Sequence, residues 1–320
     1  MADRPQTLLL YGYPQEATGD PAALESAIRT RVPDIDLVRA TDHADARERI
    51  ANAEILIEHG LTDDILDAAE NLRWLQSLSA GYDRYDLDTL RDRGVTLTTV
   101  SGVHARPIAE HVIGYLLLFE REFLQTLEQG RRRAWRRRSP SELGGRTVGI
   151  VGVGEIGGRI ADLVSAFGCE VLGVKRDPST APESVDECVS PTGLHGVLGR
   201  SDYVVVACPL TDETEGMIGA PELASMRESI LINIARGPIV DHSALVAALQ
   251  DGTLRGAALD VTDPEPLPES SRLWSLSNVV ITPHMAGGSP HYTDRCADLF
   301  AENYEAYTDG RLDDLRNRVC

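Results

Sequence analysis

Residues 147–157, which read TVGIVGVGEIG, decide the fold of this chain. An apolar strand of five residues leads directly into a GxGxxG turn, and the apolar spacing of a helix follows it. Gly152 allows the tight turn, Gly154 lets the backbone approach a pyrophosphate, and Gly157 lets the helix lie close to the sheet. Two more residues are expected to face the phosphates through backbone N–H groups at the positive end of the helix: Glu155 and Ile156. The segment therefore predicts the first strand, turn and helix of a Rossmann domain that binds a dinucleotide.

The end of the next strand distinguishes between the two nicotinamide cofactors. NAD-specific sites place an acidic residue about 20 residues beyond the glycines, where it accepts bonds from the ribose 2′-OH. Here Lys175 lies 175 − 157 = 18 residues beyond Gly157, and Arg176 follows it. Two cations favour a 2′-phosphate, so we predict that NADP(H) is preferred and that NAD(H) is possible. The alternative is that Asp177 takes the NAD role and both cations are solvated.

Short apolar segments alternate with helical ones on both sides of this turn, which is typical of parallel strands joined by crossover helices. The predicted strands before the turn are 7–11, 35–39, 55–58, 74–77 and 95–99. Those from the turn onward are 147–151, 170–174, 203–207, 230–233, 256–260 and 279–281. Helices are predicted at 21–31, 109–123 and 290–310, and the last most simply returns to the first domain. We therefore expect two α/β domains with doubly wound parallel sheets, residues 1–100 plus 289–320 and residues 101–288.

The charge of the chain is strongly negative. There are 50 acidic and 31 basic residues, giving a formal net charge of −19, and Lys175 is the only lysine. An acidic, arginine-rich and lysine-poor composition is typical of salt-adapted proteins, since salt near 1 M shortens the Debye length to about 3 Å. The alternative is a mesophilic protein from a GC-rich genome. A polyanion is a poor partner for nucleic acid or an anionic membrane, so neither partner is predicted.

Cysteine spacing and hydropathy indicate the compartment. The five cysteines are odd in number and none are in CxxC spacing, which argues against a disulfide framework or a metal site. The N-terminus lacks the basic region and long apolar core of a signal peptide. No apolar stretch reaches the roughly 20 residues that a membrane helix needs. We therefore expect a soluble cytoplasmic protein without a metal.

Three polar fragments follow predicted strands of the second domain, at residues 233–237, 260–267 and 282–288. Open α/β sheets bind their ligands at the carboxyl ends of the strands. In the order and spacing of these three fragments, the chain resembles the D-isomer-specific 2-hydroxyacid dehydrogenase family. The resemblance also covers the turn at residues 79–81, the helix start from Gly102–Ala105 to Glu110 and His111, and the glycine loop. It implies a flavodoxin-like substrate domain beside the Rossmann domain, and hydride transfer between NAD(P)(H) and a small 2-keto or 2-hydroxy acid.

The catalytic set that this resemblance implies is Arg236, Glu265 and His284, and the chemistry explains those residue types. Reduction of a keto acid needs a proton for the carbonyl oxygen, and His284 can supply it because imidazole titrates near neutral pH. Glu265 would favour the imidazolium and fix its tautomer. Arg236 offers a planar fork for the carboxylate and the keto oxygen, so both Arg236 and His284 are expected to contact substrate.

Other contacts implied by the resemblance are less specific. The backbone N–H groups of Ala80 and Gly81 correspond to a cradle for the substrate carboxylate. Asp260 corresponds to the residue that binds the nicotinamide carboxamide. The residues expected at the cofactor in this half of the site are Cys208, Pro209, Thr214, Ile234, Ala235, Asp260 and Gly287. Cys208 is interpreted as a packing residue and not as a nucleophile.

The sequence leaves rival functions open. A phosphoglycerate dehydrogenase-type enzyme is one, whereas formate dehydrogenase relatives have Gln where Glu265 stands. A dinucleotide-sensing, corepressor-like binding protein is the rival from a different class, and turnover of a keto acid would separate the two. The helix at 109–123, with Ile113, Leu116, Leu117 and Leu124 expected on one apolar side, resembles a dimerisation arm, so a homodimer is predicted. Residues 131–138 carry six arginines to which the resemblance assigns no role, although Trp135 matches a family position. We interpret the segment as a solvated arm or a strip facing an acidic partner subunit.

Overall fold

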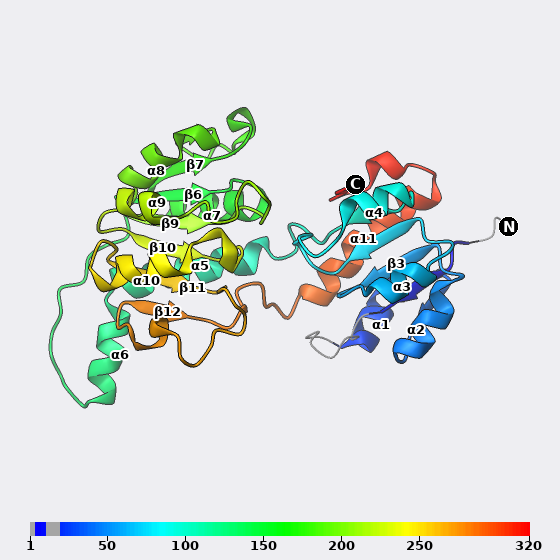
Figure 1. Ribbon diagram of the computed structural model, residues 1–320, viewed down its shortest axis with the longest axis horizontal. Helices are drawn as coiled ribbons and strands as arrows, with labels where there is room; N and C mark the ends of the chain where they lie inside the picture. The colour runs from blue at the N-terminus through cyan, green and yellow to red at the C-terminus, as the bar shows by residue number, and fades with distance from the viewer. Residues whose placement is uncertain (1–3, 11–19) are drawn as a thin grey trace. The chain divides into compact units, whose positions relative to one another are not determined.

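The computed structural model describes residues 4–10 and 20–320, and the chain divides into two compact units. One unit is discontinuous and comprises Met1–His104 and Ser289–Cys320, and the other is Ala105–Gly288 (Figure 1). The chain therefore passes twice from one unit to the other. The sequence placed the first crossing at residues 100–101, four residues earlier than in the structure, and the second at residues 288–289.

The discontinuous unit is built on a five-stranded parallel sheet in the order β2-β1-β3-β4-β5. Its strands are β1 (Thr7–Leu9), β2 (Leu37–Arg39), β3 (Ile55–Glu58), β4 (Trp74–Ser77) and β5 (Thr96–Thr98). One face packs on α1 (Pro21–Arg31) and α11 (Tyr292–Thr308). The other face packs on α2 (His43–Ile50), α3 (Asp63–Ala68) and α4 (Leu87–Asp92) (Figure 1). This strand order is that of flavodoxin-like sheets, as the resemblance implied.

The second unit contains a seven-stranded parallel sheet in the order β12-β11-β10-β9-β6-β7-β8. Its strands are β6 (Thr147–Val151), β7 (Glu170–Val174), β8 (Glu187–Val189), β9 (Tyr203–Val206), β10 (Ile230–Asn233), β11 (Gly256–Leu259) and β12 (Val279–Ile281). With β6 counted as the first strand, the order is 3-2-1-4-5-6 plus a seventh strand, which is the Rossmann order. The prediction of two doubly wound parallel-sheet domains is therefore confirmed.

Successive residues of these strands face opposite sides of the sheet, and so contribute to the two hydrophobic cores of the second unit. Tyr203 and Val205 of β9 face α5 (Ala105–Glu120) and α7 (Glu155–Ala166). Their neighbours Val204 and Val206 face the opposite layer. That layer consists of α8 (Leu194–Arg200), α9 (Ala220–Ser225) and α10 (His242–Gln250). Strands with apolar residues on both faces are what a sheet covered by helices on each side requires.

Several strand boundaries differ from those predicted. Strand 35–39 begins two residues later, strand 95–99 loses a residue at each end, and strands 203–207 and 256–260 lose their last residue. Strand 7–11 ends at Leu9, and its predicted last residue, Tyr11, lies outside the described residues. The sequence missed β8, because Glu187–Val189 begins with an exposed glutamate and has only two apolar residues, so its apolar signal is weak.

The predicted helix 109–123 was wrong in extent and in its buried face. α5 ends at Glu120, and a second helix, α6 (Phe123–Arg131), follows after a turn in which Glu122 has a φ of 54°. Of the four residues expected on one apolar side only Leu116 is buried. The buried face is instead made by Ile108, Ala109, Val112, Tyr115, Leu116 and Glu120. The helix predicted at 290–310 is α11, shorter by two residues at each end.

Among the described residues no helix is long and apolar enough to cross a membrane. Within residues 4–10 and 20–320 there is also no group of three or more His, Cys, Asp or Glu arranged to hold a metal ion. The five cysteines are free thiols.

Candidate active site

The glycine loop after β6 is shaped by close backbone contacts. Gly152 has a φ of 104°, and a Cβ added there would lie 2.5 Å from the backbone nitrogen of Cys208. A Cβ on Gly157 would lie 2.1 Å from the carbonyl oxygen of Gly152. Gly154 differs, because a Cβ there would meet no atom within 4 Å. Two of the glycines therefore close the turn tightly, and the third leaves space beside the backbone.

The start of α7 faces that space. Its N-cap is Gly154, no side chain caps the helix, and the first intrahelical bond runs from the Gly158 nitrogen to the Gly154 oxygen at 2.7 Å. The N–H groups of Glu155 and Ile156 belong to this first turn, where helix N–H groups have no partner within the helix. An uncapped helix N-terminus beside open space fits the phosphates of a dinucleotide.

The loop after β7 carries the residues predicted to recognise the adenosine ribose. Lys175 is half-buried and its ammonium group donates a hydrogen bond of 2.9 Å to the carbonyl oxygen of Thr180, while Arg176 is exposed. Asp177 caps the short 3₁₀ turn Pro178–Thr180 by accepting from both the backbone nitrogen and the hydroxyl of Ser179. These bonds hold the pKa of Asp177 below its usual value. One oxygen of the carboxylate, Oδ1, is therefore already engaged in its own turn.

The segment after β9 forms a second loop at the same edge of the sheet. Cys208 is buried, and burial raises the pKa of its thiol to about 11, as expected of a packing residue. The hydroxyl of Thr214 donates to the carbonyl oxygen of Pro209 at 2.7 Å and accepts from the backbone nitrogen of Thr211 at 2.8 Å. Thr214 thus fixes the shape of this loop, with Pro209 exposed on it.

His284 and Glu265 form a hydrogen-bonded pair. The Nδ1 atom of His284 lies 2.9 Å from Oε2 of Glu265, and the imidazole is 51% exposed. The other carboxylate oxygen of Glu265 accepts from the backbone nitrogen of Thr262 at 3.0 Å, which orients the carboxylate. Because Nδ1 is engaged by the carboxylate, Nε2 is the atom that the imidazole can present to a substrate.

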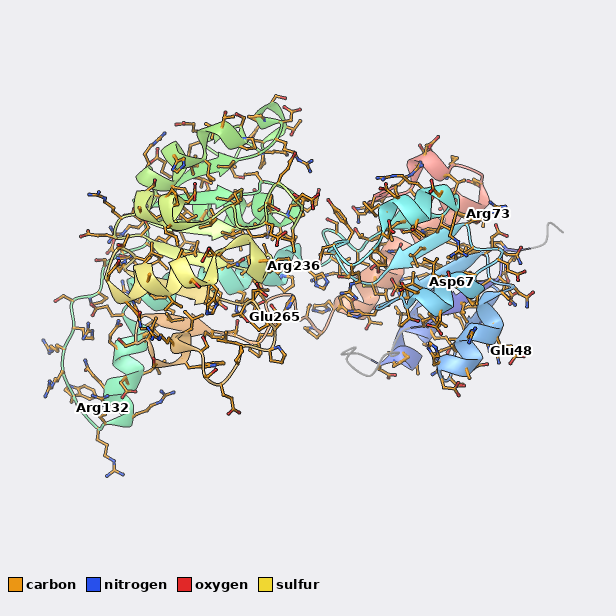
Figure 2. All side chains as sticks on the ribbon, viewed as in Figure 1. Glu48, Asp67, Arg73, Arg132, Arg236 and Glu265 are labelled. Carbon is orange, nitrogen blue, oxygen red and sulfur yellow. The ribbon has the colours of Figure 1, made fainter. Side chains whose placement is uncertain are left out.

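Arg236 approaches this pair because two loops are packed together. A Cβ added to Gly237 would lie 2.0 Å from the carbonyl oxygen of Thr262, so the loop after β10 lies directly against the loop after β11. The Arg236 guanidinium is half-buried and donates to the carbonyl oxygen of Ala235 at 2.8 Å. Figure 2 labels Arg236 and Glu265 at this carboxyl edge of the second unit. The structure therefore brings together the three predicted catalytic residues at one edge of one sheet.

Asp260 anchors the loop that carries His284. Its carboxylate is 3% exposed and accepts from the hydroxyl of Thr282 and from the backbone nitrogens of Met285 and Ala286, the last two at 2.9 Å. The backbone nitrogen of His284 donates to the Asp260 carbonyl oxygen at 2.8 Å. The loop needs this anchoring because His284 has a φ of 48°, in the left-handed region. The predicted carboxamide contact of Asp260 stays a prediction.

Sequence reasoning missed two residues that shape the site. Asn233, the last residue of β10, is buried, donates to the Arg236 carbonyl oxygen at 2.9 Å and accepts from the Ala235 nitrogen at 3.1 Å. Thr262 holds the Glu265 carboxylate through its backbone and donates its hydroxyl to the Pro264 carbonyl oxygen at 2.9 Å. Asn233 could have been found from the sequence, because it is a polar residue at the end of an otherwise apolar strand.

Ile234, Ala235 and Gly287, the remaining expected cofactor contacts, lie in these same loops. Ile234 and Ala235 are buried directly after β10, and Gly287 is half-buried after the His284 loop. Ala80 and Gly81 belong to the discontinuous unit, where they are half-buried after β4. The turn before them is fixed by Ser79, whose nitrogen donates to the Ser77 hydroxyl oxygen at 3.1 Å and whose carbonyl accepts from the Val100 nitrogen at 3.1 Å.

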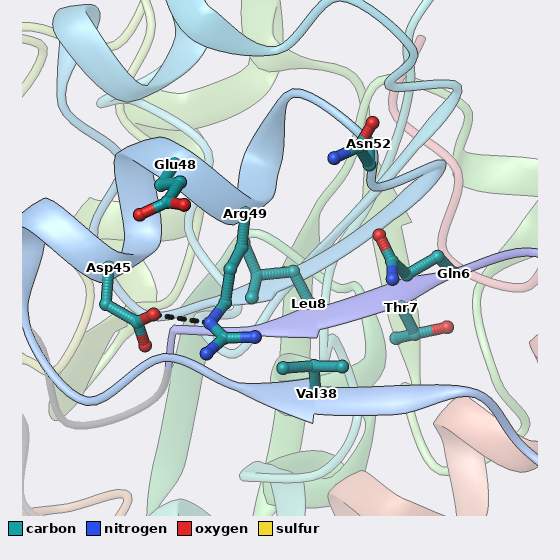
Figure 3. Close-up of a pocket in the computed structure, with 8 residues that line it drawn as sticks. All are labelled: Gln6, Thr7, Leu8, Val38, Asp45, Glu48, Arg49 and Asn52. Atoms are coloured by element: carbon teal, nitrogen blue, oxygen red, sulfur yellow. Dashed lines mark hydrogen bonds and ion pairs between the residues drawn. The ribbon is translucent and has the colours of Figure 1, made fainter.

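A hollow on the discontinuous unit contains none of the predicted site residues. It lies between β1, β2 and α2 and is lined by Gln6, Thr7, Leu8, Val38, Asp45, Glu48, Arg49 and Asn52 (Figure 3). Arg49 pairs with Asp45, one turn away on the same helix, α2. Since the lining includes the first residues of β1, the hollow does not coincide with the carboxyl edge where the ligands of such sheets bind.

The Rossmann sheet, the glycine loop and the His284–Glu265 pair define a nicotinamide-dependent oxidoreductase. Residues 113–286 match the model of the D-isomer specific 2-hydroxyacid dehydrogenase NAD-binding domain. The chain belongs to the D-isomer-specific 2-hydroxyacid dehydrogenase family, which confirms the resemblance seen in the sequence.

Similar proteins support this assignment. The chain is 34% identical over 264 residues to a glyoxylate reductase of Thermofilum pendens, covering 80% of this chain and 78% of that protein. It is 36% identical over 256 residues to a glyoxylate/hydroxypyruvate reductase B of Yersinia pestis, covering 76% and 77%. A D-isomer specific 2-hydroxyacid dehydrogenase of Xanthobacter autotrophicus Py2, solved with NADPH and MES, has a TM-score of 0.86 at 29% identity and covers 99% and 98% of the two chains. The protein is therefore an NAD(P)-dependent 2-hydroxyacid dehydrogenase.

Proposed function

We propose that this protein reduces a small 2-keto acid to the corresponding 2-hydroxy acid with NADPH, and catalyses the reverse reaction. The nicotinamide supplies the hydride to the keto carbon. The carbonyl oxygen then needs one proton, and His284 donates it from Nε2. The products are the 2-hydroxy acid, the oxidised cofactor and a neutral imidazole, which takes up a proton from solvent before the next turnover.

The observation that carries this proposal is the 2.9 Å contact between Nδ1 of His284 and Oε2 of Glu265. In the imidazolium both ring nitrogens are donors, so Glu265 accepts from Nδ1 while Nε2 faces the carbonyl oxygen. The carboxylate stabilises the charged ring and fixes the tautomer that remains after proton transfer. The Thr262 nitrogen on the second oxygen of Glu265 keeps the carboxylate from rotating away.

Arg236 is assigned to the substrate carboxylate and keto oxygen. A guanidinium can donate two parallel bonds to such a group, and the Asn233 side chain fixes the backbone from which Arg236 projects. The discontinuous unit is proposed as the substrate domain, with the backbone N–H groups of Ala80 and Gly81 as donors to a substrate carboxylate. The experiment that tests the function is turnover of a panel of 2-keto acids with each coenzyme. A dinucleotide-sensing protein would bind coenzyme but turn over none of them.

NADP(H) is proposed as the preferred coenzyme, with Lys175 and Arg176 as the cause. Asp177, the residue that could take the NAD role, already caps its own turn. The solved Xanthobacter relative holds NADPH.

We predict that Lys175→Asp shifts coenzyme preference toward NAD(H). Charge-assisted bonds to phosphate contribute about 1.5–3 kcal/mol each when partly enclosed, and about 1.4 kcal/mol corresponds to tenfold. Because Arg176 is exposed, only the half-buried Lys175 is counted as an enclosed contact, so the wild-type preference should be tens- to hundreds-fold. The substitution should remove roughly tenfold or more, chiefly through the KM for NADPH. The preference should also fall in salt. Steady-state kinetics with both coenzymes measure this. Arg159→Asp, which replaces a half-buried arginine that pairs with Asp162 on α7, is the charge-matched control. Equal use of NADH and NADPH by the wild type, unaltered by the substitution, would show that both cations are solvated.

The proposed assembly is a symmetric homodimer that uses α6 and the segment after it. None of the residues of α6 are buried, and this part of the second unit exposes Phe123, Leu127 and, at 98%, Trp135. Exposed aromatic and apolar side chains of this kind are typical of an interface. Around them Arg131 and Arg132 pair with Glu128, and Arg138 pairs with Glu122. Figure 2 labels Arg132 on this arm.

Light scattering should therefore give a dimer mass for the wild type. The double variant Leu127→Glu/Trp135→Ala should dissociate, since it places charge where the apolar contact forms. Arg47→Glu on α2 of the discontinuous unit serves as the control and should stay dimeric. A wild-type monomer from low to molar salt would contradict the dimer. The cytoplasmic location is proposed from cysteine spacing and hydropathy, and the adaptation to salt from the acidic, arginine-rich composition.

A further inference from the structure

A buried carboxyl group lies at the carboxyl end of β3, outside the catalytic set. Glu58 is 0% exposed, and its Oε1 atom accepts a hydrogen bond from the hydroxyl of Tyr85. Its Oε2 atom has no hydrogen-bond partner within the described part of the chain. Burial raises the pKa of Glu58 to about 7, with the Tyr85 bond, the charge of Arg84 and the Gly60 backbone opposing the rise. The side chain therefore changes charge near neutral pH.

Glu58 is connected to the turn that carries Ala80 and Gly81. The Tyr85 hydroxyl that contacts Glu58 also lies 2.7 Å from Oγ of Ser77, the last residue of β4. The same Oγ accepts from the backbone nitrogen of Ser79 at 3.1 Å. Three consecutive hydrogen bonds thus lead from the carboxyl group to the first residue of the turn.

The direction of these bonds depends on the charge of the carboxyl group. Tyr85 has a single proton, so it cannot donate to Glu58 and Ser77 together. When Glu58 is ionised, Tyr85 must donate to it, and the Ser77 hydroxyl turns to donate to Tyr85. When Glu58 is protonated, it donates to Tyr85, and Tyr85 donates to the Ser77 oxygen that also accepts from Ser79. Ionisation therefore reverses the Tyr85–Ser77 bond beside the turn and adds a buried negative charge three hydrogen bonds away from Ser79.

We propose that Glu58 is a positioning residue for substrate, whose protonated form holds the Ser79–Gly81 turn ready for an anionic carboxylate through Tyr85 and Ser77. This inference rests on the proposed function, because it takes Ala80 and Gly81 as carboxylate donors. The ionised form opposes substrate in two ways, through the rearranged hydrogen bonds and through charge repulsion. The KM for the keto acid should therefore rise with pH, while the rate at saturation should not follow Glu58.

Other groups around Glu58 are charged or titratable and set the background. Arg84 comes from the turn after Gly81 and donates to the carbonyl oxygen of His59 at 2.6 Å. His59 follows Glu58 directly, and burial together with Arg84 and His104 lowers its pKa. His59 therefore loses its charge at lower pH than Glu58 gains one. A variant at Glu58 is therefore needed to isolate its contribution.

The test compares Glu58→Gln with wild type from pH 5.5 to 8.5. Glutamine imitates the protonated carboxyl and cannot ionise, so the KM of the variant should stay low where the wild-type KM rises. The ratio of wild-type to variant KM should be near one at pH 5.5 and on the order of fivefold at pH 8.5, given one screened charge at this range. The kcat profiles should coincide, because Glu58 takes no part in the chemical step.

The chain offers a matched control. Glu54 precedes β3 at the opposite edge of the sheet and accepts from the hydroxyl of Tyr307 at 2.6 Å. Glu54→Gln removes a carboxylate from an equivalent tyrosine pair without touching the turn, so its KM profile should follow wild type. A Glu58→Gln profile that also follows wild type would overturn the inference.

Stability supplies an independent readout. Because the folded-state pKa of Glu58 lies above that of a free glutamate, the folded state binds the proton more tightly. Its contribution is full below the unfolded pKa near 4.5 and is lost as pH rises to about 7. The urea midpoint of wild type should therefore fall over this range relative to Glu58→Gln.

Tyr85→Phe removes the hydroxyl that connects Glu58 to Ser77, and should raise the KM for the keto acid at low pH, where wild type binds well. If no keto acid is turned over, the proposed function fails. If turnover is normal and the two KM profiles coincide, only the role of Glu58 fails.

Discussion

Replacement of His284 by glutamine is expected to lower the rate of keto-acid reduction by roughly 10²–10⁴-fold, the usual contribution of a general acid. Glutamine retains a polar side chain but has no proton to give at neutral pH. The glycine loop and the start of α7 are separate from His284 in the unit, so coenzyme affinity, measured by fluorescence titration, should change little. The loss should appear in kcat and in kcat/KM alike, because the proton moves only in the transition state.

Backbone conformation requires a second variant at this position. His284 has a φ of 48°, where asparagine is tolerated better than glutamine. His284→Asn should therefore fold at least as well as His284→Gln and be equally inactive, which separates loss of the proton donor from loss of the loop.

A second histidine–glutamate pair in the same unit provides the control. His195 on α8 lies 3.2 Å from Oε1 of Glu222 and 3.0 Å from the Ser225 hydroxyl, and it is as exposed as His284. It lies in the α8–α9 layer, not on the catalytic loops. His195→Gln should keep the wild-type rate. A His284 variant that also kept the wild-type rate would remove His284 from the mechanism.

The sheets were the most predictable part of the fold. β3, β4, β6, β7, β10 and β12 have the predicted bounds, because each has apolar residues that pack against the helices on the two faces of its sheet. β8 was missed because Glu187–Val189 begins with an exposed glutamate and has only two apolar residues, which gives a weaker signal. Helix 109–123 was extended too far because composition alone does not show that Glu122 adopts a left-handed φ and ends one helix before another begins.

The sequence predicted which residues form the candidate site better than it predicted the hydrogen bonds that hold them. Arg236, Glu265 and His284 follow three different strands, and parallel strands bring their carboxyl ends to one edge. The supporting bonds of Asn233 and Thr262 depend on loop conformations that no spacing rule specifies. Glu58 was overlooked for a different reason, since an acidic residue that ends a strand is usually solvated and only packing shows that this one is buried.

Substitution of Arg236 is the second change expected to have a large effect. Arg236→Ala removes two charge-assisted bonds to the substrate, each about 1.5–3 kcal/mol, so kcat/KM should fall roughly 10²–10⁴-fold. Arg236→Lys restores the charge but not the fork, because an ammonium cannot form two parallel bonds to a planar group. It should recover only part of the loss and remain at least tenfold below wild type.

The position of Arg236 makes the lysine variant a test of geometry and not only of charge. The Asn233 side chain holds the Arg236 carbonyl, and Gly237 fits against Thr262, so the backbone is fixed before the side chain begins. A lysine at this place therefore starts from the same point and differs in its donors alone. Added guanidinium ion should partly restore Arg236→Ala and should do little for Arg236→Lys, whose ammonium occupies the site. Arg200→Lys, on an arginine that pairs with Glu187 and Glu170 at the distant β8 edge of the sheet, should leave the kinetics unaltered. If Arg236→Lys matched wild type in both kcat and KM, the substrate would be held by charge alone and the bidentate contact would be wrong.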